Sequence, residues 1–256
     1  MTHVLLIGHS HITCVIAGFF RMREPQVTLD TIYLRDHKMV GGEKNFPDFI
    51  SEAVETRLKP RSTNGDTLEP IRSGRVLVLL SLGGNSHSLF GLIKTKPAFD
   101  LVLSSRPDLP LDKESKLLPE QAVKDTIRAR ERQALRGIEV IKDVTRQAIF
   151  YESPPPIGDD DFVRANLDPY FRQNFKQEEL ANIVSPALRY KLWRLSSDLF
   201  REHCESLSIP YVTCPDWVMD DGMFLKREAY ANNVTHGNDW YGEQVLRNVL
   251  ETARKL

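Results

Sequence analysis

Short runs of apolar residues, separated by stretches with helical periodicity, are the feature that most constrains the fold of this chain. Strands covered on both faces, as in a parallel sheet, are nearly continuous in apolar residues. Six runs are predicted to be such strands: His3–Ile7, Thr28–Tyr33, Arg75–Ser81, Leu101–Ser104, Gln147–Glu152 and Ile209–Thr213. The chain is therefore expected to form a mainly parallel central sheet.

Helices are predicted between and after these strands. The predicted helices are Asp48–Leu58, Glu120–Val144, Ala187–Ser206 and Asp239–Lys255. Strands that alternate with helices favour a three-layer α/β/α sandwich, with helices on both sides of the sheet. We expect one domain over residues 1–256, with a surface loop at 59–73 and a helical elaboration at 105–146.

Charge balance and cysteine content indicate which binding partners and which cellular compartment to expect. The 34 basic and 35 acidic residues nearly balance, so no general attraction to nucleic acid or to an anionic membrane is expected. No run approaches the roughly 20 apolar residues of a membrane helix, and "VLLI" near the N-terminus lacks the flanks of a signal peptide. Cys14, Cys204 and Cys214 favour free thiols and a cytoplasmic protein, although a Cys204–Cys214 pair stays open.

Three short polar motifs lie where loops leave the predicted strands or enter the last helix. Gly8–His11 ("GHSH") follows the first strand, Gly83–Ser86 ("GGNS") follows the third, and Asn233–His236 ("NVTH") precedes the last helix. In open α/β sheets, active sites collect at the carboxyl ends of the strands. We therefore expect the three motifs to converge.

The residue types in these motifs suit acyl transfer. This chemistry needs a hydroxyl nucleophile, a base for its proton, and donors aimed at the developing oxyanion. Ser10 is the candidate nucleophile, His236 is the candidate base, and the Asn85 amide is a candidate donor. Glycines allow backbone amides to approach a ligand closely, so Gly41 and Gly42 are further candidates.

In this order the motifs resemble those of the SGNH/GDSL hydrolase family, which is named after its serine, glycine, asparagine and histidine. The resemblance implies a flavodoxin-like sandwich and a serine esterase with Ser10 as nucleophile, His236 as base and Asn233 orienting the base. It also implies an oxyanion hole formed by Ser10, Gly42 and Asn85, with Gly41 as the alternative glycine. The implied substrate is a small acyl ester, such as an acetyl ester or an ester on a carbohydrate, and no cofactor is implied.

The sequence departs from the family pattern at three positions. His9 replaces the aspartate of the first block, and Ser86 replaces the second acid of the third block. Asn233 replaces the carboxylate that orients the base, and an amide does not offset the positive charge on a protonated imidazole. If Asn233 presents its carbonyl oxygen to the ring, the tautomer of His236 is preserved. Candidates for the missing charge are Asp220, Asp221 and Asp239.

Other interpretations of the same residues stay open. Ser10 suits a helix cap, Asn85 suits a turn, and Asn233 favours a non-hydrolytic domain that binds a glycan or another ligand. An acyltransferase would use the same acyl-serine. A metal site is not expected, because the four histidines at positions 9, 11, 87 and 236 do not form a His-Glu-x-x-His pattern.

Two loops are expected to border the site. "YESPPPIGDDD" at 151–161 resembles the strand-end loop beside the substrate cleft in many of these hydrolases, and Asp159–Asp161 suit a cap for the next segment. Asn238 or Asp239 is expected to cap the last helix, which places His236 on the loop just before it.

Overall fold

The computed structural model describes residues 2–34, 46–59, 69–73, 75–83, 86–145 and 148–255. Three predicted site residues lie outside these ranges, namely Gly41, Gly42 and Asn85, and so does Gly84 of the third motif. Ser10, Asn233 and His236 lie within them.

Within the described ranges, five parallel strands form the central sheet in the order β2-β1-β3-β6-β7. Numbered by their sequence order within this sheet, they run 2-1-3-4-5, which is the flavodoxin-like arrangement. The prediction of an α/β sandwich with a parallel sheet is confirmed. The bounds of the strands are β1 (Thr2–Gly8), β2 (Val27–Tyr33), β3 (Val76–Ser81), β6 (Ile149–Tyr151) and β7 (Tyr211–Val212).

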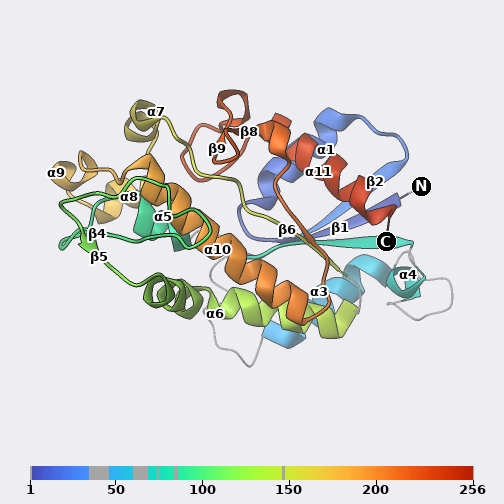
Figure 1. Ribbon diagram of the computed structural model, residues 1–256. Coiled ribbons are helices and arrows are strands. Elements are labelled where there is room, and N and C mark those ends of the chain that lie inside the picture. The colour runs from blue at the N-terminus through green and yellow to red at the C-terminus, as the bar shows by residue number, and fades with distance from the viewer. Residues whose placement is uncertain are drawn as a thin grey trace.

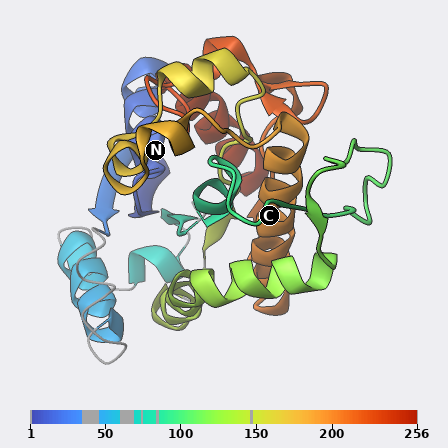
Figure 2. The ribbon, with the colours of Figure 1, turned by 90° about the vertical axis from the view of Figure 1, so that its left-hand side faces the viewer.

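The alternation of side chains along β1 divides the core into two layers. Val4 and Leu6 pack with helices α1 (Ile12–Met22) and α11 (Asp239–Ala253) on one face of the sheet. Leu5 and Ile7 pack on the other face, where three long helices contribute. These are α3 (Phe46–Leu58), α6 (Glu120–Thr145) and α10 (Pro186–Ser206). Figures 1 and 2 show the α1–α11 pair and the α3–α6 pair on opposite sides of the strands.

Shorter elements surround these layers. The short helices are α4 (Glu69–Arg72), α5 (Ser86–Gly91), α7 (Asp160–Ala165), α8 (Pro169–Asn174) and α9 (Gln177–Leu180). The short strands are β4 (Phe99–Asp100), β5 (Lys116–Leu117), β8 (Met219–Asp220) and β9 (Phe224–Leu225). A third apolar cluster joins α7 and α8 to the segment before α11, through residues that include Val163, Phe171 and Val234.

The prediction of a strand at Leu101–Ser104 is wrong. Leu101 and Leu103 are buried, as their apolar character indicated, but the Leu101 amide donates to the Asp100 carboxylate at 2.7 Å. This carboxylate also bonds Lys191, on α10, at 2.8 Å. The polar anchor replaces strand pairing at this point, so the segment leaves β4 as an irregular loop.

The two predicted elaborations also differ in detail from the structure. The segment 59–73 contains α4, and its residues 60–68 lie outside the described ones. In the segment 105–146, only the part from Glu120 onward is helical, and α6 ends at Thr145. All three cysteines are buried and free, so the alternative Cys204–Cys214 disulfide is not formed.

Candidate functional site

The first and third motifs meet at the point where the strand order reverses. Gly8 at the end of β1 pairs with Ser81 of β3, and a Cβ on Gly8 would lie 2.2 Å from the Ser81 carbonyl oxygen. The Gly83 amide donates to Nδ1 of His9 at 3.3 Å. His9, at the position of the family aspartate, therefore connects the loop after β1 to the loop after β3.

Ser10 lies on the turn between β1 and α1. The N-cap of α1 is His11, which makes no capping hydrogen bond with its side chain. The Ser10 carbonyl accepts hydrogen bonds from the Thr13 amide at 3.1 Å and the Thr13 hydroxyl at 2.7 Å. Ser10 is therefore tied to the first turn through its backbone, and the interpretation of its side chain as the helix cap is wrong.

Close packing of α1 against α11 brings Ser10 and His236 to the same place. A Cβ on Gly242 would lie 1.8 Å from the Cys14 carbonyl oxygen, and a Cβ on Gly18 would lie 2.1 Å from the Glu243 amide nitrogen. Only glycine permits such an approach of two helix backbones. Because Ser10 precedes α1 and His236 precedes α11, the crossing places the two loops side by side.

Ser10 and His236 line the same open depression, whose volume is about 310 Å³. Asn233 lines it too, as do residues from the first turns of α1 and α11. The Nε2 atom of His236 is buried and has no hydrogen-bond partner among the described residues, so no hydrogen bond joins it to Ser10. The structure thus brings nucleophile and base candidates into one cavity, without a direct bond between them.

The Asn233 side chain holds the His236 ring through its oxygen. Oδ1 of Asn233 accepts from the His236 amide at 3.0 Å and from the Thr235 amide at 3.2 Å. Two backbone donors aimed at one atom require that atom to be the carbonyl oxygen. The same oxygen lies 3.0 Å from Nδ1 of His236, so Nδ1 carries the proton and Nε2 is the free acceptor.

A carboxylate reaches the histidine from another part of the chain. The Thr235 hydroxyl lies 2.8 Å from Nδ1 of His236 and donates to Oδ2 of Asp168 at 3.3 Å. Asp168 directly precedes α8. The sequence did not single out this aspartate.

The predicted sources of the missing charge are arranged differently. Asp239 pairs with Arg21 at 3.3 Å and accepts from the Trp240 amide at 2.9 Å. Asp220 belongs to β8. The shift in the pKa of His236 arises from burial and from Asp168, and not from Asp220 or Asp221. The prediction that Asn238 or Asp239 caps the last helix is confirmed. Asn238 is the N-cap of α11, and its side chain accepts from the Tyr241 amide at 3.0 Å.

Burial dominates the electrostatics of the His236–Asp168 pair. It lowers the pKa of His236 from the ordinary value of 6.5, while attraction to Asp168 opposes this shift. Burial likewise raises the pKa of Asp168, and the charge of His236 opposes that shift. Both groups move toward their neutral forms, so desolvation outweighs their mutual attraction. A neutral imidazole near pH 7 is the form that a general base requires.

The second histidine of the opening motif packs against the base candidate. His11 is 1% exposed, and the centroids of its ring and the His236 ring are 5.0 Å apart. The His11 carbonyl oxygen accepts from the Cys14 thiol at 2.9 Å and from the Tyr151 hydroxyl at 3.4 Å. These contacts fix the turn that carries Ser10.

Glu131 of α6 holds the described end of the third motif. Glu131 is 5% exposed, and its carboxylate accepts from the amide of Ser86, the first residue of α5, at 3.2 Å. Oε2 of the same carboxylate lies 2.3 Å from the position of a Cβ on Gly83. A carboxylate from a distant helix therefore lies at the loop where the family pattern has an acid and this chain has Ser86.

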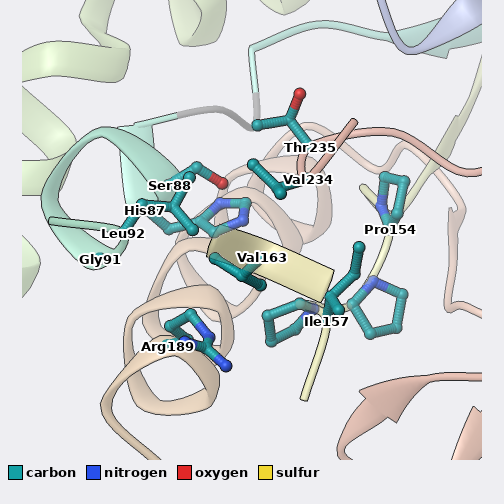
Figure 3. A pocket seen from close by; sticks show the side chains of 12 residues that line it. His87, Ser88, Gly91, Leu92, Pro154, Ile157, Val163, Arg189, Val234 and Thr235 are labelled. Carbon is teal, nitrogen blue, oxygen red and sulfur yellow. The ribbon is translucent and has the colours of Figure 1, made fainter. Parts of the chain in front are cut away.

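A second, smaller pocket borders the 234–235 segment and has a volume of about 20 Å³. Val234 and Thr235 line it together with Ile157 and Val163, and His87 projects into it (Figure 3). The Pro154–Pro156 stretch, from the loop expected beside a cleft, forms part of its wall. At the end of this loop, Asp159 caps α7 as predicted.

Neither a metal cluster nor a membrane helix occurs in the part of the chain that the structure describes. No three histidine, cysteine, aspartate or glutamate side chains converge there as metal ligands do. None of the helices there combines the length and the apolar character needed to cross a bilayer.

Comparisons with known proteins give structural likeness without sequence likeness. No family model and no curated protein matches the sequence. A GDSL-like lipase from Bacteroides thetaiotaomicron is 10% identical, with a TM-score of 0.44, over 99% of this chain and 88% of that one. The periplasmic domain of a lipopolysaccharide acetyltransferase from Salmonella ser. Paratyphi A is 10% identical, with a TM-score of 0.47, over 98% and 82%.

An extracellular lipase from Streptomyces rimosus is similar to a comparable degree. It is 9% identical, with a TM-score of 0.47, and the similarity covers 99% of this chain and all of that one. The fold of this chain is given by its strand order and its two helical layers.

Proposed function

We propose that this protein is a serine-dependent acyl-ester hydrolase, with Ser10 as the nucleophile and His236 as the base. The observation that carries the proposal is the state of the His236 ring. Oδ1 of Asn233 accepts a hydrogen bond from the Nδ1 of His236, and Nε2 is left without a hydrogen-bond partner among the described residues, beside the cavity that Ser10 also lines. A histidine held in this tautomer has its acceptor nitrogen ready for a serine proton.

The reaction proceeds in two halves. Oγ of Ser10 attacks the ester carbonyl carbon while its proton passes to Nε2 of His236, and the carbonyl oxygen becomes an oxyanion. His236 then gives the proton to the departing alkoxide, and the acyl group stays on Ser10. Water repeats the sequence on the acyl-serine: its proton passes to His236 and on to Oγ of Ser10, and a carboxylic acid leaves.

The oxyanion would be stabilised by donors from the segments that follow β1, β2 and β3 in the sequence. The proposed donors are the backbone amides of Ser10 and Gly42, with Gly41 as the alternative, and the side chain of Asn85. Gly41, Gly42 and Asn85 are assigned by the family resemblance alone. The contact of the Ser86 amide with Glu131 supports the assignment of Asn85, because it fixes the neighbouring residue of that loop.

The proposed substrates are small acyl esters, such as acetyl esters and esters on carbohydrates, as the family resemblance implies. The open depression that Ser10 and His236 line, with a volume of about 310 Å³, is the proposed place of the ester.

The test compares the protein with its Ser10→Ala variant. Both are incubated with a fluorophosphonate probe and with aryl acetate and aryl octanoate esters. Labelling and acetate turnover in the protein, and neither in the variant, are the expected results. Equal inactivity of the two would favour the ligand-binding alternative. If an added alcohol receives the acyl group faster than water does, the protein is an acyltransferase.

A further inference from the structure

We propose that Asp168 is the carboxylate that supports His236, and that it acts through the Thr235 hydroxyl in place of the acid that Asn233 lacks. This inference rests on the function proposed above. It makes Asp168 and Thr235 positioning residues, since neither is proposed to touch the substrate.

The hydrogen bonds run in one direction, from the ring to the carboxylate. The Thr235 hydroxyl has a single proton and two acceptors within reach, Oδ2 of Asp168 at 3.3 Å and Oδ1 of Asn233 at 3.5 Å. We assign the proton to Asp168, which is the nearer acceptor, because Oδ1 of Asn233 already accepts from two backbone amides. A lone pair of the hydroxyl then faces Nδ1 of His236 at 2.8 Å. Nδ1 carries a proton, because its other neighbour at 3.0 Å is the Asn233 oxygen. The ring therefore donates to two oxygens, and one of them leads to a negative charge.

Asp168 is the negatively charged group best placed to balance the positive charge that His236 acquires. When Nε2 accepts the serine proton, the ring becomes a cation, and neutral Asn233 does not balance it. The other groups around the ring do not supply the balance either. His11, from the turn before α1, is a second imidazole, and Asp239, from the first turn of α11, is paired with Arg21. Attraction between Asp168 and His236 acts on the pKa of both groups.

Apolar packing holds the start of α8 against the loop before α11. Leu167 directly precedes Asp168, and Phe171 lies in the first turn of α8. Both are buried in the same apolar cluster as Val234, which directly precedes Thr235. Although Asp168 occupies the N-cap position of α8, its side chain makes no capping hydrogen bond. The carboxylate is therefore available to Thr235, which lies 67 residues away in the sequence.

The first experiment measures the pH dependence of kcat and KM in four variants. Asp168→Asn and Thr235→Val should lower kcat roughly 10- to 100-fold with little change in KM, which is less than the roughly 10⁴-fold effect of a directly bonded triad aspartate. The acid limb of kcat/KM should move to lower pH in Asp168→Asn. Thr235→Ser keeps the hydroxyl and should retain most of the activity. Asp161→Asn, which removes a fully exposed carboxylate nearby, should behave as the unmodified protein.

A double variant tests the replacement directly. Asn233→Asp places a carboxylate at the family position, so it should restore most of the kcat lost in Asp168→Asn. In the otherwise unmodified protein the same change should give a small gain, because the charge is already supplied. If Asp168→Asn matches Asp161→Asn in kcat and pH profile, the proposal is overturned. It is also overturned if Asn233→Asp raises kcat equally in both backgrounds.

A measurement without substrate separates this proposal from the proposed function. The pKa of His236 is followed by NMR titration in the unmodified protein and in the same variants. It should fall in Asp168→Asn and stay unchanged in Asp161→Asn. If the pKa of His236 falls in Asp168→Asn but the fluorophosphonate probe does not label the protein, the proposed esterase function is overturned and the coupling of Asp168 to His236 is supported. An unchanged pKa in Asp168→Asn would overturn the coupling, whether or not the protein hydrolyses esters.

Discussion

The face of the sheet covered by α1 and α11 carries both groups proposed for proton transfer, whereas the face covered by α3, α6 and α10 carries the side chains that fix loops. On the first face, two glycines let the helix backbones touch, and the loops before both helices meet. On the second face, Glu131 of α6 reaches the loop after β3, and Lys191 of α10 reaches the loop after β4. On the first face helix packing aligns the site, and on the second face single buried side chains hold loops in place.

This difference predicts that stability and activity change together on the first face. On the second face, activity should change only where the loop that is fixed carries a proposed site residue. The variants below test it in order of the expected loss.

Lys191→Met should give the largest loss of stability. Lys191 is fully buried and bonds the Asp100 carboxylate at 2.8 Å and the Pro110 carbonyl at 2.9 Å. Removing the ammonium leaves a buried carboxylate without its cation, which costs about 3–5 kcal/mol. Urea denaturation should show this loss, while kcat of the folded fraction stays unchanged. Lys124→Met, at the more exposed pair with Glu202, is the control and should cost about 0–1 kcal/mol.

Gly242→Ala should cost both stability and activity. The added methyl would overlap the Cys14 carbonyl oxygen, so α1 and α11 must move apart, at a cost of about 3 kcal/mol. The same movement separates Ser10 from His236, and kcat/KM should fall at temperatures where the protein is still folded. Thermal unfolding and ester turnover are measured on one sample. A stable but inactive variant would agree with helix packing aligning the site, whereas an unstable but fully active one would contradict it.

Glu131→Gln should have an intermediate effect. The Ser86 amide at the start of α5 donates a hydrogen bond to the Glu131 carboxylate, and the substitution removes the charge of this acceptor. A hydrogen bond to a charged group contributes roughly 1.5–3 kcal/mol to stability. Because the neighbouring Asn85 is a proposed oxyanion donor, we also expect roughly a tenfold drop in kcat, which is below the loss of a donor itself. Asp125→Asn, an exposed carboxylate on the same helix, provides the baseline. Unchanged kcat would limit Glu131 to a structural role.

The smallest effect concerns pH. Burial lowers the pKa of His236 in the folded state below its ordinary 6.5, so the neutral ring is favoured. The stability that this contributes is present above pH 6.5 and is lost as the pH falls through the folded-state value. The acid limb of kcat/KM should accordingly lie below pH 6.5. A limb above 6.5 would mean that the attraction of Asp168 exceeds the effect of burial.

Much of the fold follows from local patterns in the sequence. The apolar runs at the start of the chain and before Gly83 are strands β1 and β3, and the periodicity after Pro119 is α6, because such patterns depend on near neighbours alone. The strand predicted at Leu101–Ser104 is absent for the same reason, because a local apolar pattern does not show whether a neighbouring strand pairs with it. Its apolar residues are buried as predicted, but a single carboxylate beside them bonds the backbone in place of a neighbouring strand.

The candidate site divides in the same way. Motif order alone marked Ser10, Asn233 and His236, and the structure places all three around one depression. Asp168 has no motif around it, and the acidic residues nearer to His236 in the sequence were the natural candidates for its charge. Distance along the chain is a poor guide here, since buried packing between α8 and the loop before α11 sets the contact.

The sequence by itself determined the order of strands and helices and the residue types at the loops that end them, because these depend on local composition and periodicity. Only the tertiary structure decided that His9 bonds the Gly83 amide, that the Asn233 oxygen faces the ring of His236, and that Asp168 reaches this ring through Thr235. The reason is physical: hydrogen-bond direction and charge compensation depend on distances between atoms, and those distances are set by how helices and loops pack.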